Sequence, residues 1–258
     1  MLRVESVSKS FGGIEALTNC SFEVEEGTIT GLIGPNGAGK TTLFNVVTGF
    51  LSADSGHIYF NEQEITNLEP YQVSRLGIFR SFQLTRELGG LTVLENLMLA
   101  RKLEVGESLF GVWVKQKETR SSESKVRQKA IEVLEYLEME GKKDELAKNL
   151  PGGEKKLLDV GRMMMIEPKI ALLDEPGAGV PPAIQNKLLD YVEDLCEEGV
   201  TFLVVEHDMN IMMDLCNPIV VLSDGSKLVK GTPNEVRNNE EVIEAYLGKQ
   251  ESGEGVGL

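Results

Sequence analysis

The sequence is poor in cysteine and lacks any long apolar run. Its 258 residues include three cysteines, Cys20, Cys196 and Cys216. Their number is odd and their spacing matches no disulfide framework or zinc site, so we expect reduced thiols in a cytosolic protein. No apolar stretch approaches the roughly 20 residues that cross a bilayer, and "MLRVESVSKSFGG" contains no apolar core of a secretory signal. These absences argue against a disulfide-rich secreted domain and a membrane-spanning chain.

Basic side chains are also in short supply. Lys and Arg number 26 against 41 Asp and Glu, which gives a formal net charge of -15 at pH 7. A protein whose main task is to hold nucleic acid needs a positive face, so this balance predicts no nucleic-acid partner. It remains compatible with docking onto the basic cytoplasmic loops of a membrane protein.

The beginning of the chain has the pattern of short strands. Alternating apolar residues in "MLRVESVS" and "CSFEVEEGTITGLIG" predict strands, the later of which runs into a glycine-rich loop. "KTTLFNVVTGF" predicts a helix that stops at Gly49, and "GHIYFNEQEI" predicts another strand and a turn. We therefore expect antiparallel, hairpin-like strands near the start, with one parallel strand that enters the loop.

The middle of the chain is helical in character. "VLENLMLARKL" and "SESKVRQKAIEVLEYLEME" predict two amphipathic helices, because their apolar residues recur at helical spacing. Between them, "EVGESLFGVWVKQKETRSS" is mixed and holds the only tryptophan, Trp113. Aromatic side chains there would anchor a partner or pack locally, and the sequence leaves both open.

The last part of the chain alternates apolar strands with helices. After Pro151 we expect a helix that ends at "EPK", and then the buried strands "IALLDE" and "VTFLVVEHD" with the helix "AIQNKLLDYVEDLCEEG" between them. The segment "PIVVLSDGSKLVKG" predicts a hairpin with Asp224-Gly225 at its turn. This alternation indicates a parallel sheet that is covered on both faces. We expect an α/β fold with an N-terminal antiparallel β subdomain and an inserted helical subdomain over about residues 84–160. Residues 1–248 would form one domain, and the Gly-rich, acidic residues 249–258 a flexible tail.

The segment "GPNGAGKT", residues 34–41, fits the phosphate-binding pattern G-x-x-x-x-G-K-[ST] between a predicted strand and a predicted helix. Its glycines would let successive N–H groups curl round phosphates, Lys40 would reach the β- and γ-phosphates, and Thr41 would face Mg²⁺. A plain glycine-rich turn does not explain a lysine and a hydroxyl at this offset. The expected nucleotide-binding residues of the loop are Gly34, Pro35, Asn36, Gly37, Ala38, Gly39, Lys40, Thr41 and Thr42.

Two adjacent acids at the end of a buried strand complement this loop. Asp174 follows four apolar residues in "IALLDEP" and is placed to hold the metal ion. Glu175, next to it, is placed to polarise the attacking water as general base. A helix-cap pair is the alternative reading, but it leaves the phosphate loop without its acid. The sequence thus predicts ATP and Mg²⁺ as ligands.

The order of these motifs resembles the ATP-binding subunit of an ABC transporter, a P-loop NTPase with a RecA-like parallel sheet core. Beyond the loop, the resemblance includes "KSFGG", "RSFQ", "LPGGE", "LLDEPGAG" and "VVEHDM". It spans nearly the whole chain. The branched-chain amino-acid uptake type is the most similar, because "LTVLENLMLA", "VVTGF" and the closing "VIEAYLG" also match that group.

The resemblance assigns roles to residues outside the phosphate loop. Phe11 would stack on adenine, Gln83 would touch Mg²⁺ or the water, and His207 would hydrogen-bond the γ-phosphate. The implied catalytic set is Glu175, His207 and Gln83, and the implied metal set is Thr41, Gln83 and Asp174. His57 matches no motif and is expected to be an ordinary strand residue.

The resemblance also implies a composite site. Two such subunits would pack head to tail, so that Gly152 and Gly153 bring helix N–H groups onto the partner's γ-phosphate. Glu154 follows them, and a carboxylate ~6 Å from a phosphate charge would cost roughly 3 kcal/mol at an effective dielectric of 20. We expect its side chain to turn outward along the first helical turn, with Lys155 and Lys156 offsetting the charge.

Two departures from the wider family pattern concern prolines. Pro151 replaces a serine whose hydroxyl many ABC proteins aim at the γ-phosphate, so one contact is lost. Pro181 and Pro182 fall in the interface loop after "GAGV", where similar proteins more often have one polar residue and one proline. Both changes bear on turnover and on communication between the two sites.

The implied partners are a second ATP-binding subunit, identical or paralogous, two transmembrane permease subunits docked near residues 84–115, and indirectly a substrate-binding protein. The chain would then sit at the cytoplasmic face of the cell membrane.

Two alternatives remain open. One is an ATPase for export or lipid extraction, like the lipopolysaccharide-transport ATPases, which the chain also resembles at "GGE" and "AGV". The other is a non-transport ABC ATPase of DNA repair or translation, which the missing coiled coil and the acidity oppose.

Overall fold

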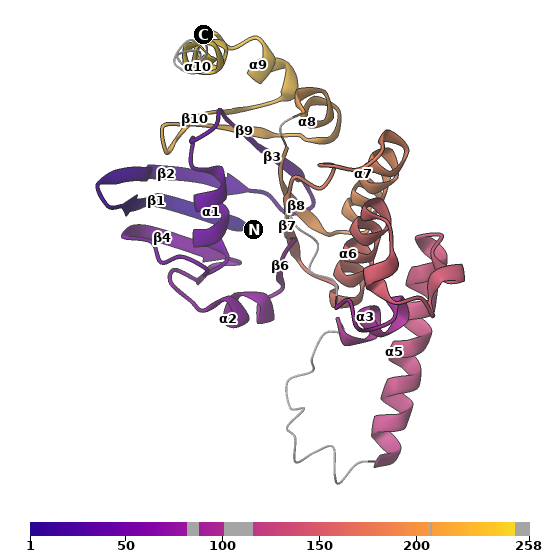
Figure 1. Ribbon diagram of the computed structural model, residues 1–258. Helices are drawn as coiled ribbons and strands as arrows, with labels where there is room; N and C mark the ends of the chain where they lie inside the picture. Colours follow the sequence, from indigo (N-terminus) through magenta and orange to yellow (C-terminus); the bar gives the residue numbers. More distant parts are fainter. Residues whose placement is uncertain (82–87, 101–115, 207, 251–258) are drawn as a thin grey trace. The chain divides into compact units, whose positions relative to one another are not determined.

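The alternating apolar residues at the start of the chain form an antiparallel sheet in this computed structural model (Figure 1), which describes residues 1–81, 88–100, 116–206 and 208–250. The sheet order is β2-β1-β4-β5, with bounds β1 Leu2–Phe11, β2 Ile14–Val24, β4 Ser55–Phe60 and β5 Gln63–Glu64. Strand β1 lies centrally and pairs antiparallel with both neighbours, with Leu2 opposite Val24 on one side and opposite Phe60 on the other. The predicted hairpin-like arrangement of the first strands is confirmed.

A second sheet contains the buried strands, in the order β10-β9-β3-β8-β7-β6. Its strands are β3 Ile29–Ile33, β6 Ile78–Arg80, β7 Ile170–Asp174, β8 Thr201–Val205, β9 Ile219–Ser223 and β10 Ser226–Gly231. All of them run parallel except β10, which pairs antiparallel with β9. Every residue of β3, β7 and β8 is buried. This is the burial that a parallel sheet covered on both faces requires, and it confirms the predicted α/β fold.

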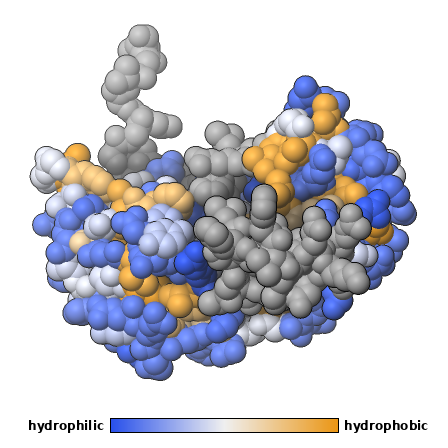
Figure 2. Space-filling model, turned by 90° about the horizontal axis from the view of Figure 1, so that it is seen from below, coloured by the Kyte–Doolittle hydropathy of each residue, from blue (hydrophilic) through white to orange (hydrophobic). Residues whose placement is uncertain are grey.

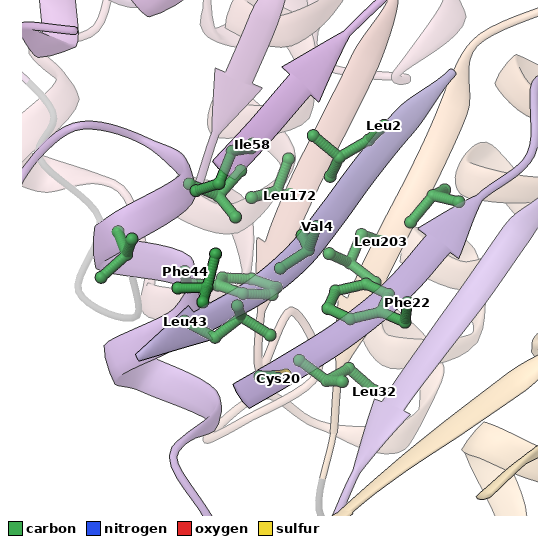
Figure 3. Close-up of a cluster of buried hydrophobic side chains, with 14 of the residues drawn as sticks. Leu2, Val4, Cys20, Phe22, Leu32, Leu43, Phe44, Ile58, Leu172 and Leu203 are labelled. Atoms are coloured by element: carbon green, nitrogen blue, oxygen red, sulfur yellow. The ribbon is translucent and has the colours of Figure 1, made fainter. Parts of the chain in front are cut away.

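Helix α1 (Lys40–Val47) and the two sheets share one hydrophobic core. Figure 3 shows Leu43 and Phe44 of α1 pointing toward side chains of both sheets, among them Val4 and Leu172. Leu43 and Phe44 are fully buried. Burial of a side chain of this size contributes roughly 1.5–3 kcal/mol, so this core fixes the helix that follows the phosphate loop.

Further helices in the part of the chain that contains the two sheets are α2 Pro70–Arg75, α8 Met209–Leu215, α9 Pro233–Arg237 and α10 Glu240–Gln250. The β9–β10 hairpin turns at Asp224 and Gly225, with φ values of 48° and 77°, as the Asp-Gly pair predicts. Helix α10 includes Gln250, so it enters the segment expected to be a tail. The rest of that segment lies outside the described residues.

The chain divides into two compact units. The core unit comprises Met1–Arg80, Lys169–Pro176 and Val192–Leu258, and it contains both sheets. The helical unit comprises Ser81–Pro168 and Gly177–Tyr191. Because the boundary at Tyr191 falls inside a helix, α7 (Pro182–Glu197) contributes residues to both units.

The helical unit contains α3 Val93–Leu99, α5 Gln116–Tyr136, the 3-10 turns η1 Glu140–Lys142 and η2 Ala147–Asn149, α6 Gly152–Ile166 and the first part of α7. Its core joins Leu97 of α3, Leu134 of α5 and Leu158 of α6. Helix α5 begins at Gln116, earlier than the apolar pattern indicates. Gln, Lys, Glu and Arg favour helix without needing apolar contacts, so polar turns extend it.

The three cysteines are free thiols, as expected. Cys20 and Cys216 are buried, and burial raises the pKa of Cys20 to about 11 and that of Cys216 to about 12. The thiolate is the reactive form, so both side chains act as small apolar residues in the core.

Hydrophilic residues cover much of the face drawn in Figure 2, with hydrophobic residues in separate patches. The large hydrophobic side chains exposed among the described residues are Phe11, Ile14, Phe50, Tyr71, Leu88, Leu99, Tyr136 and Ile243. In the described residues, no helix is both long and apolar enough to cross a membrane.

Candidate nucleotide site

The loop between β3 and α1 has a backbone that only glycine adopts easily. Gly34, Gly37 and Gly39 have φ values of 154°, 81° and 97°. A Cβ on Gly34 would lie 2.3 Å from the Leu222 carbonyl oxygen, and one on Gly39 would lie 2.5 Å from that of Ala16. Gly37 meets no atom within 4 Å, so its glycine is required by the backbone angle alone. Two of the three glycines thus also fix the loop against neighbouring strands.

Lys40 is a buried lysine at the first position of α1. Its Nζ donates to the carbonyl oxygens of Gly34 and Pro35, at 2.6 and 3.2 Å. The ammonium group therefore lies against the loop that precedes its own helix. This is the position from which it can reach an anion cradled by the loop.

The start of α1 is open to an anion. Gly39 is the N-cap and gives no side-chain hydrogen bond to the first turn, and that turn carries no acid. Helix N–H groups without a capping side chain, together with the helix dipole, favour a phosphate there. Thr41 is exposed on this turn and Thr42 is half-buried.

The remaining loop residues differ in exposure. Pro35 and Ala38 are buried, and the Ala38 N–H donates to the Pro35 carbonyl oxygen at 3.1 Å. Asn36 is exposed. The loop therefore closes a turn with its apolar residues inside and leaves Asn36 and Gly37 facing outward.

Tyr246 in α10 contacts the same loop, and sequence reasoning missed it. Burial raises the pKa of the Tyr246 hydroxyl, and a hydrogen bond from the Gly34 backbone partly offsets this rise. The segment "VIEAYLG" contains this tyrosine, but nothing in its pattern indicates a contact more than 200 residues back along the chain.

Asp174 is the last residue of β7, and its carboxylate is buried. The Arg80 Nη2 lies 3.7 Å from its Oδ2. Arg80 also donates from Nη1 to Asn45 Oδ1 at 2.6 Å and to Thr48 Oγ1 at 3.2 Å, both on the C-terminal half of α1 or at its end. The arginine thus joins the acid of β7 to the helix of the phosphate loop, although no sequence pattern indicated this role.

Glu175 has a left-handed backbone, with φ 51°. This conformation costs a non-glycine residue roughly 1–2 kcal/mol. The Glu175 N–H donates to the Val205 carbonyl oxygen at 2.9 Å, which ties this residue to the end of β8. Such strain at a half-buried acid, directly after the sheet, is typical of a functional position.

The residues present suit Mg²⁺ held together with a nucleotide. Among the described residues, no three His, Cys, Asp or Glu side chains form a metal cluster. Mg²⁺ in nucleotide sites needs only one or two protein oxygens, because phosphates and waters complete its shell. The Asp174 carboxylate and the Thr41 hydroxyl are hard oxygen donors of this kind. Both lie in the core unit, Asp174 at the end of β7 and Thr41 in α1, which follows β3 of the same parallel sheet.

Phe11 ends β1 and is exposed. Lys9 places its Nζ 5.6 Å from the centre of the Phe11 ring. Asp54 holds this strand end, because its carboxylate accepts hydrogen bonds from Lys9 Nζ, the Ser10 N–H and the Ser10 hydroxyl, at 2.6, 2.7 and 2.9 Å. The Lys9 bond, followed by the two from Ser10, lowers the pKa of Asp54 to about 2. An exposed ring on an anchored strand end is free to stack on a base.

The "LPGGE" motif lies at the start of α6, in the helical unit. Pro151 is the N-cap, without a side-chain hydrogen bond, and the helix begins at Gly152. A Cβ on Gly152 would meet no atom within 4 Å, whereas one on Gly153 would lie 3.2 Å from Ile184. Glu154, in the first turn, forms an ion pair with Lys142, a residue that sequence reasoning also missed.

Several expected residues lie outside the described part of the chain. They are Gln83, His207 and Trp113, together with most of the segment expected to meet permeases. Pro182 is described, and it is the first residue of α7 instead of a loop residue. Proline suits this position because its missing N–H would be unpaired there in any case.

The chain is similar to proteins of known family. The family model described as ABC transporter matches residues 17–178. The model described as branched-chain amino acid ATP-binding cassette transporter matches residues 226–252, which include Tyr246.

Relatives are similar along almost their whole length. The probable branched-chain amino acid transport ATP-binding protein LivG of Archaeoglobus fulgidus is 41% identical, with 98% of this chain and 97% of that protein covered. The high-affinity LivG of Salmonella typhimurium is 38% identical, with 96% and 98% covered. A crystal structure of the ADP conformation of MJ1267, an ATP-binding cassette of an ABC transporter, has 37% identity and a TM-score of 0.81, with 96% and 98% covered.

Proposed function

The chain belongs to the ABC transporter family, among the ATP-binding cassettes of the branched-chain amino-acid type, and we propose that it powers an importer through ATP-driven closure of a dimer. As a member of this family it is an ATPase that energises transport. The observation that carries the proposal is the glycine loop after β3, with Lys40 folded against it at an uncapped helix start. The relatives' names, which print branched-chain amino acid transport, favour branched-chain or related amino acids as cargo.

Residues 34–42 would bind the phosphates of ATP. Loop N–H groups and the start of α1 would surround the phosphate oxygens. Lys40 would give up its hydrogen bonds to the loop carbonyls and donate to the β- and γ-phosphates in their place. Phe11 would stack on adenine. Thr41 and Asp174 would hold Mg²⁺, with Gln83 as a further ligand by resemblance, and the ion would offset phosphate charge when bound.

Hydrolysis would depend on the residues that follow β7 and β8. Glu175 would accept a proton from the attacking water as general base, and its fixed backbone would orient the carboxylate. His207 would hydrogen-bond the γ-phosphate, and Gln83 would orient the water. Both of these residues lie outside the described part of the chain, so their roles rest on the resemblance alone.

The signature loop would serve the nucleotide of a second subunit. The start of α6 has an N-cap without a hydrogen-bonding side chain and an unobstructed Gly152, so a phosphate can approach its N–H groups. Gly153 and Glu154 complete this loop. Tighter binding of ATP to the closed dimer than to the open one would drive closure.

The remaining proposals concern assembly. Residues 1–248 would act as one ABC-type domain whose helical part, at about residues 84–160, ends in the signature loop. Two permease subunits would dock on that helical part and hold the chain at the cytoplasmic face of the membrane. A substrate-binding protein would act on the permeases and make no contact with this chain.

Replacement of Glu175 by Gln tests the proposal. The variant Glu175→Gln should bind ATP with unchanged affinity but hydrolyse it at least a hundredfold more slowly, because a general base contributes about 10²–10⁴ in rate. It should also accumulate an ATP-loaded dimer, which size-exclusion chromatography with light scattering detects.

Glu193→Gln is the matched control, because Glu193 is an exposed acid of the core unit on α7 and the change in charge is the same. It should turn over ATP like the unsubstituted chain. Unchanged turnover in Glu175→Gln would remove Glu175 as the base.

A further inference from the structure

The acid of the signature loop has a fixed partner outside that loop. Lys142, the last residue of η1, donates from Nζ to both carboxylate oxygens of Glu154, at 2.5 Å each. The two side chains are 36% and 23% exposed. Both residues belong to the helical unit, so the pair is internal to one compact part of the chain.

Glu154 creates an electrostatic difficulty at the proposed site. It lies in the first turn of α6, whose N–H groups would receive the γ-phosphate of the second subunit. An uncompensated carboxylate ~6 Å from a phosphate charge would weaken closure roughly a hundredfold at an effective dielectric of 20. A cation that holds both carboxylate oxygens removes most of this repulsion and fixes where the carboxylate lies.

We propose that Lys142 is a positioning residue of the signature loop, which holds the Glu154 carboxylate and cancels its charge so that the nucleotide of a second subunit can approach Gly152 and Gly153. The inference rests on the proposed function, since it requires the start of α6 to meet that nucleotide. Ion pairs with partly exposed side chains stabilise a fold only slightly. The effect of this pair should therefore be visible in dimer closure and not in folding.

The neighbouring lysine provides a matched comparison. Lys143 forms its ion pair with Glu140, three residues earlier, at 3.2 Å, and has a similar exposure of 34%. Lys142→Met and Lys143→Met therefore remove the same charge from adjacent positions. Only the first removes the cation that holds the Glu154 carboxylate.

The experiment measures the Kd of ATP-driven dimerisation by analytical ultracentrifugation, in the Glu175→Gln background that prevents turnover. It uses this chain alone and mixed with the proposed paralogous ATP-binding subunit. Lys142→Met should weaken association about tenfold or more, which corresponds to one charge interaction of about 1.4 kcal/mol. Lys143→Met should stay within about twofold of the background, since screened surface charges contribute little. Equal association of the two variants would overturn the inference.

A second substitution separates charge compensation from other roles of Lys142. Adding Glu154→Gln to Lys142→Met should restore most of the lost affinity, because no uncompensated carboxylate remains. If the double variant stays as weak as Lys142→Met, the lysine acts on the phosphate directly and the proposed pairing is wrong.

Salt provides a readout that a merely structural role would not move. The deficit of Lys142→Met should shrink as ionic strength rises from about 0.05 to 0.5 M, since the charges at the loop become screened. A deficit that persists at high salt and accompanies a lowered melting temperature would mean a folding role and would overturn the inference.

Failure of the inference and failure of the proposed function give different results. If the background protein associates with ATP and Lys142→Met does so equally well, only the inference falls. If ATP drives dimerisation neither of this chain alone nor of its mixture with the second subunit, the proposed dimer closure is wrong, and the proposed role of Lys142 is wrong with it.

Discussion

Gly152 occupies a position where the fold itself accepts other residues. Its backbone lies outside the left-handed region and a Cβ there would meet no atom within 4 Å, whereas Gly153 packs against Ile184. A glycine without a steric or conformational reason inside its own chain suggests a contact with something outside that chain. In the proposed dimer, that contact is the partner's γ-phosphate.

The variant Gly152→Asp should therefore separate folding from function. An acid in the first turn of a helix is favourable by about 0.3–1 kcal/mol, so the melting temperature should hold or rise slightly. ATP-driven dimerisation in the Glu175→Gln background should weaken at least a hundredfold, because a new carboxylate would face the phosphate. Gly90→Asp is the control, since Gly90 also lies in the helical unit and also has open space around it. Unimpaired closure in Gly152→Asp would show that α6 does not begin at a phosphate.

Single residues also show where sequence reasoning ends. The phosphate loop, Asp174 at the end of β7 and Glu175 after it were predictable, because their residue types lie at fixed spacing beside a strand and a helix. Lys142, Arg80 and Tyr246 were not, since no local sequence pattern links any of them to its partner, neither Lys142 to Glu154, 12 residues away, nor the other two to partners much farther along the chain. Charged and aromatic residues at unremarkable positions carry no signal until the fold brings their partners close.

At the scale of elements, the apolar pattern predicted the buried central strands and the helices α1, α3, α5, α6 and α7, whereas α2, β6, α8, α9 and α10 were not predicted. The buried strands and the Asp-Gly hairpin were predictable because burial on both faces and turn chemistry leave local marks. The start of α5 was missed because polar turns of a projecting helix have no apolar period (Figure 1). Pro182 was expected in a loop but begins α7. The proline directly before it made a loop the more obvious interpretation of the sequence.

Gly49 follows the C-cap of α1, and its replacement should be costly. Gly49 has φ 76°, and a Cβ there would lie 2.2 Å from the Leu68 carbonyl oxygen, which belongs to backbone and cannot swing away. Gly49→Ala should therefore lower the free energy of unfolding by roughly 1–2 kcal/mol because of the left-handed backbone, and further because backbone atoms near Leu68 must be displaced. Urea unfolding followed by circular dichroism measures the loss.

Gly199 after α7 is the control for this prediction, because it has φ 101° but no atom within 4 Å of a Cβ. Gly199→Ala should lose only the conformational part, about 1 kcal/mol. Equal losses of unfolding free energy in the two variants would mean that the backbone near Leu68 moves without measurable cost and that the clash does not destabilise the fold.

At the scale of the whole molecule, charge bears on how the chain reaches a membrane. The formal net charge at pH 7 is -15. The cytoplasmic leaflet carries anionic lipids, which attract basic segments and repel an acidic surface. Attachment through the proposed permease subunits, with their basic loops, is therefore favoured over attachment to lipid.

A flotation experiment tests this mode of attachment. Mixed with vesicles that contain about 30% anionic lipid, an amount chosen to give a negative surface potential, the chain should stay in the dense fraction at physiological salt. With vesicles of the same composition that hold the two proposed permease subunits, the chain should float. Raising the salt to about 1 M should release part of it, because contacts between an acidic chain and basic loops are screened within ~3 Å at that concentration. Flotation with the bare anionic vesicles would mean that the chain binds lipid by itself, and the permeases would then not be needed to explain its place at the membrane.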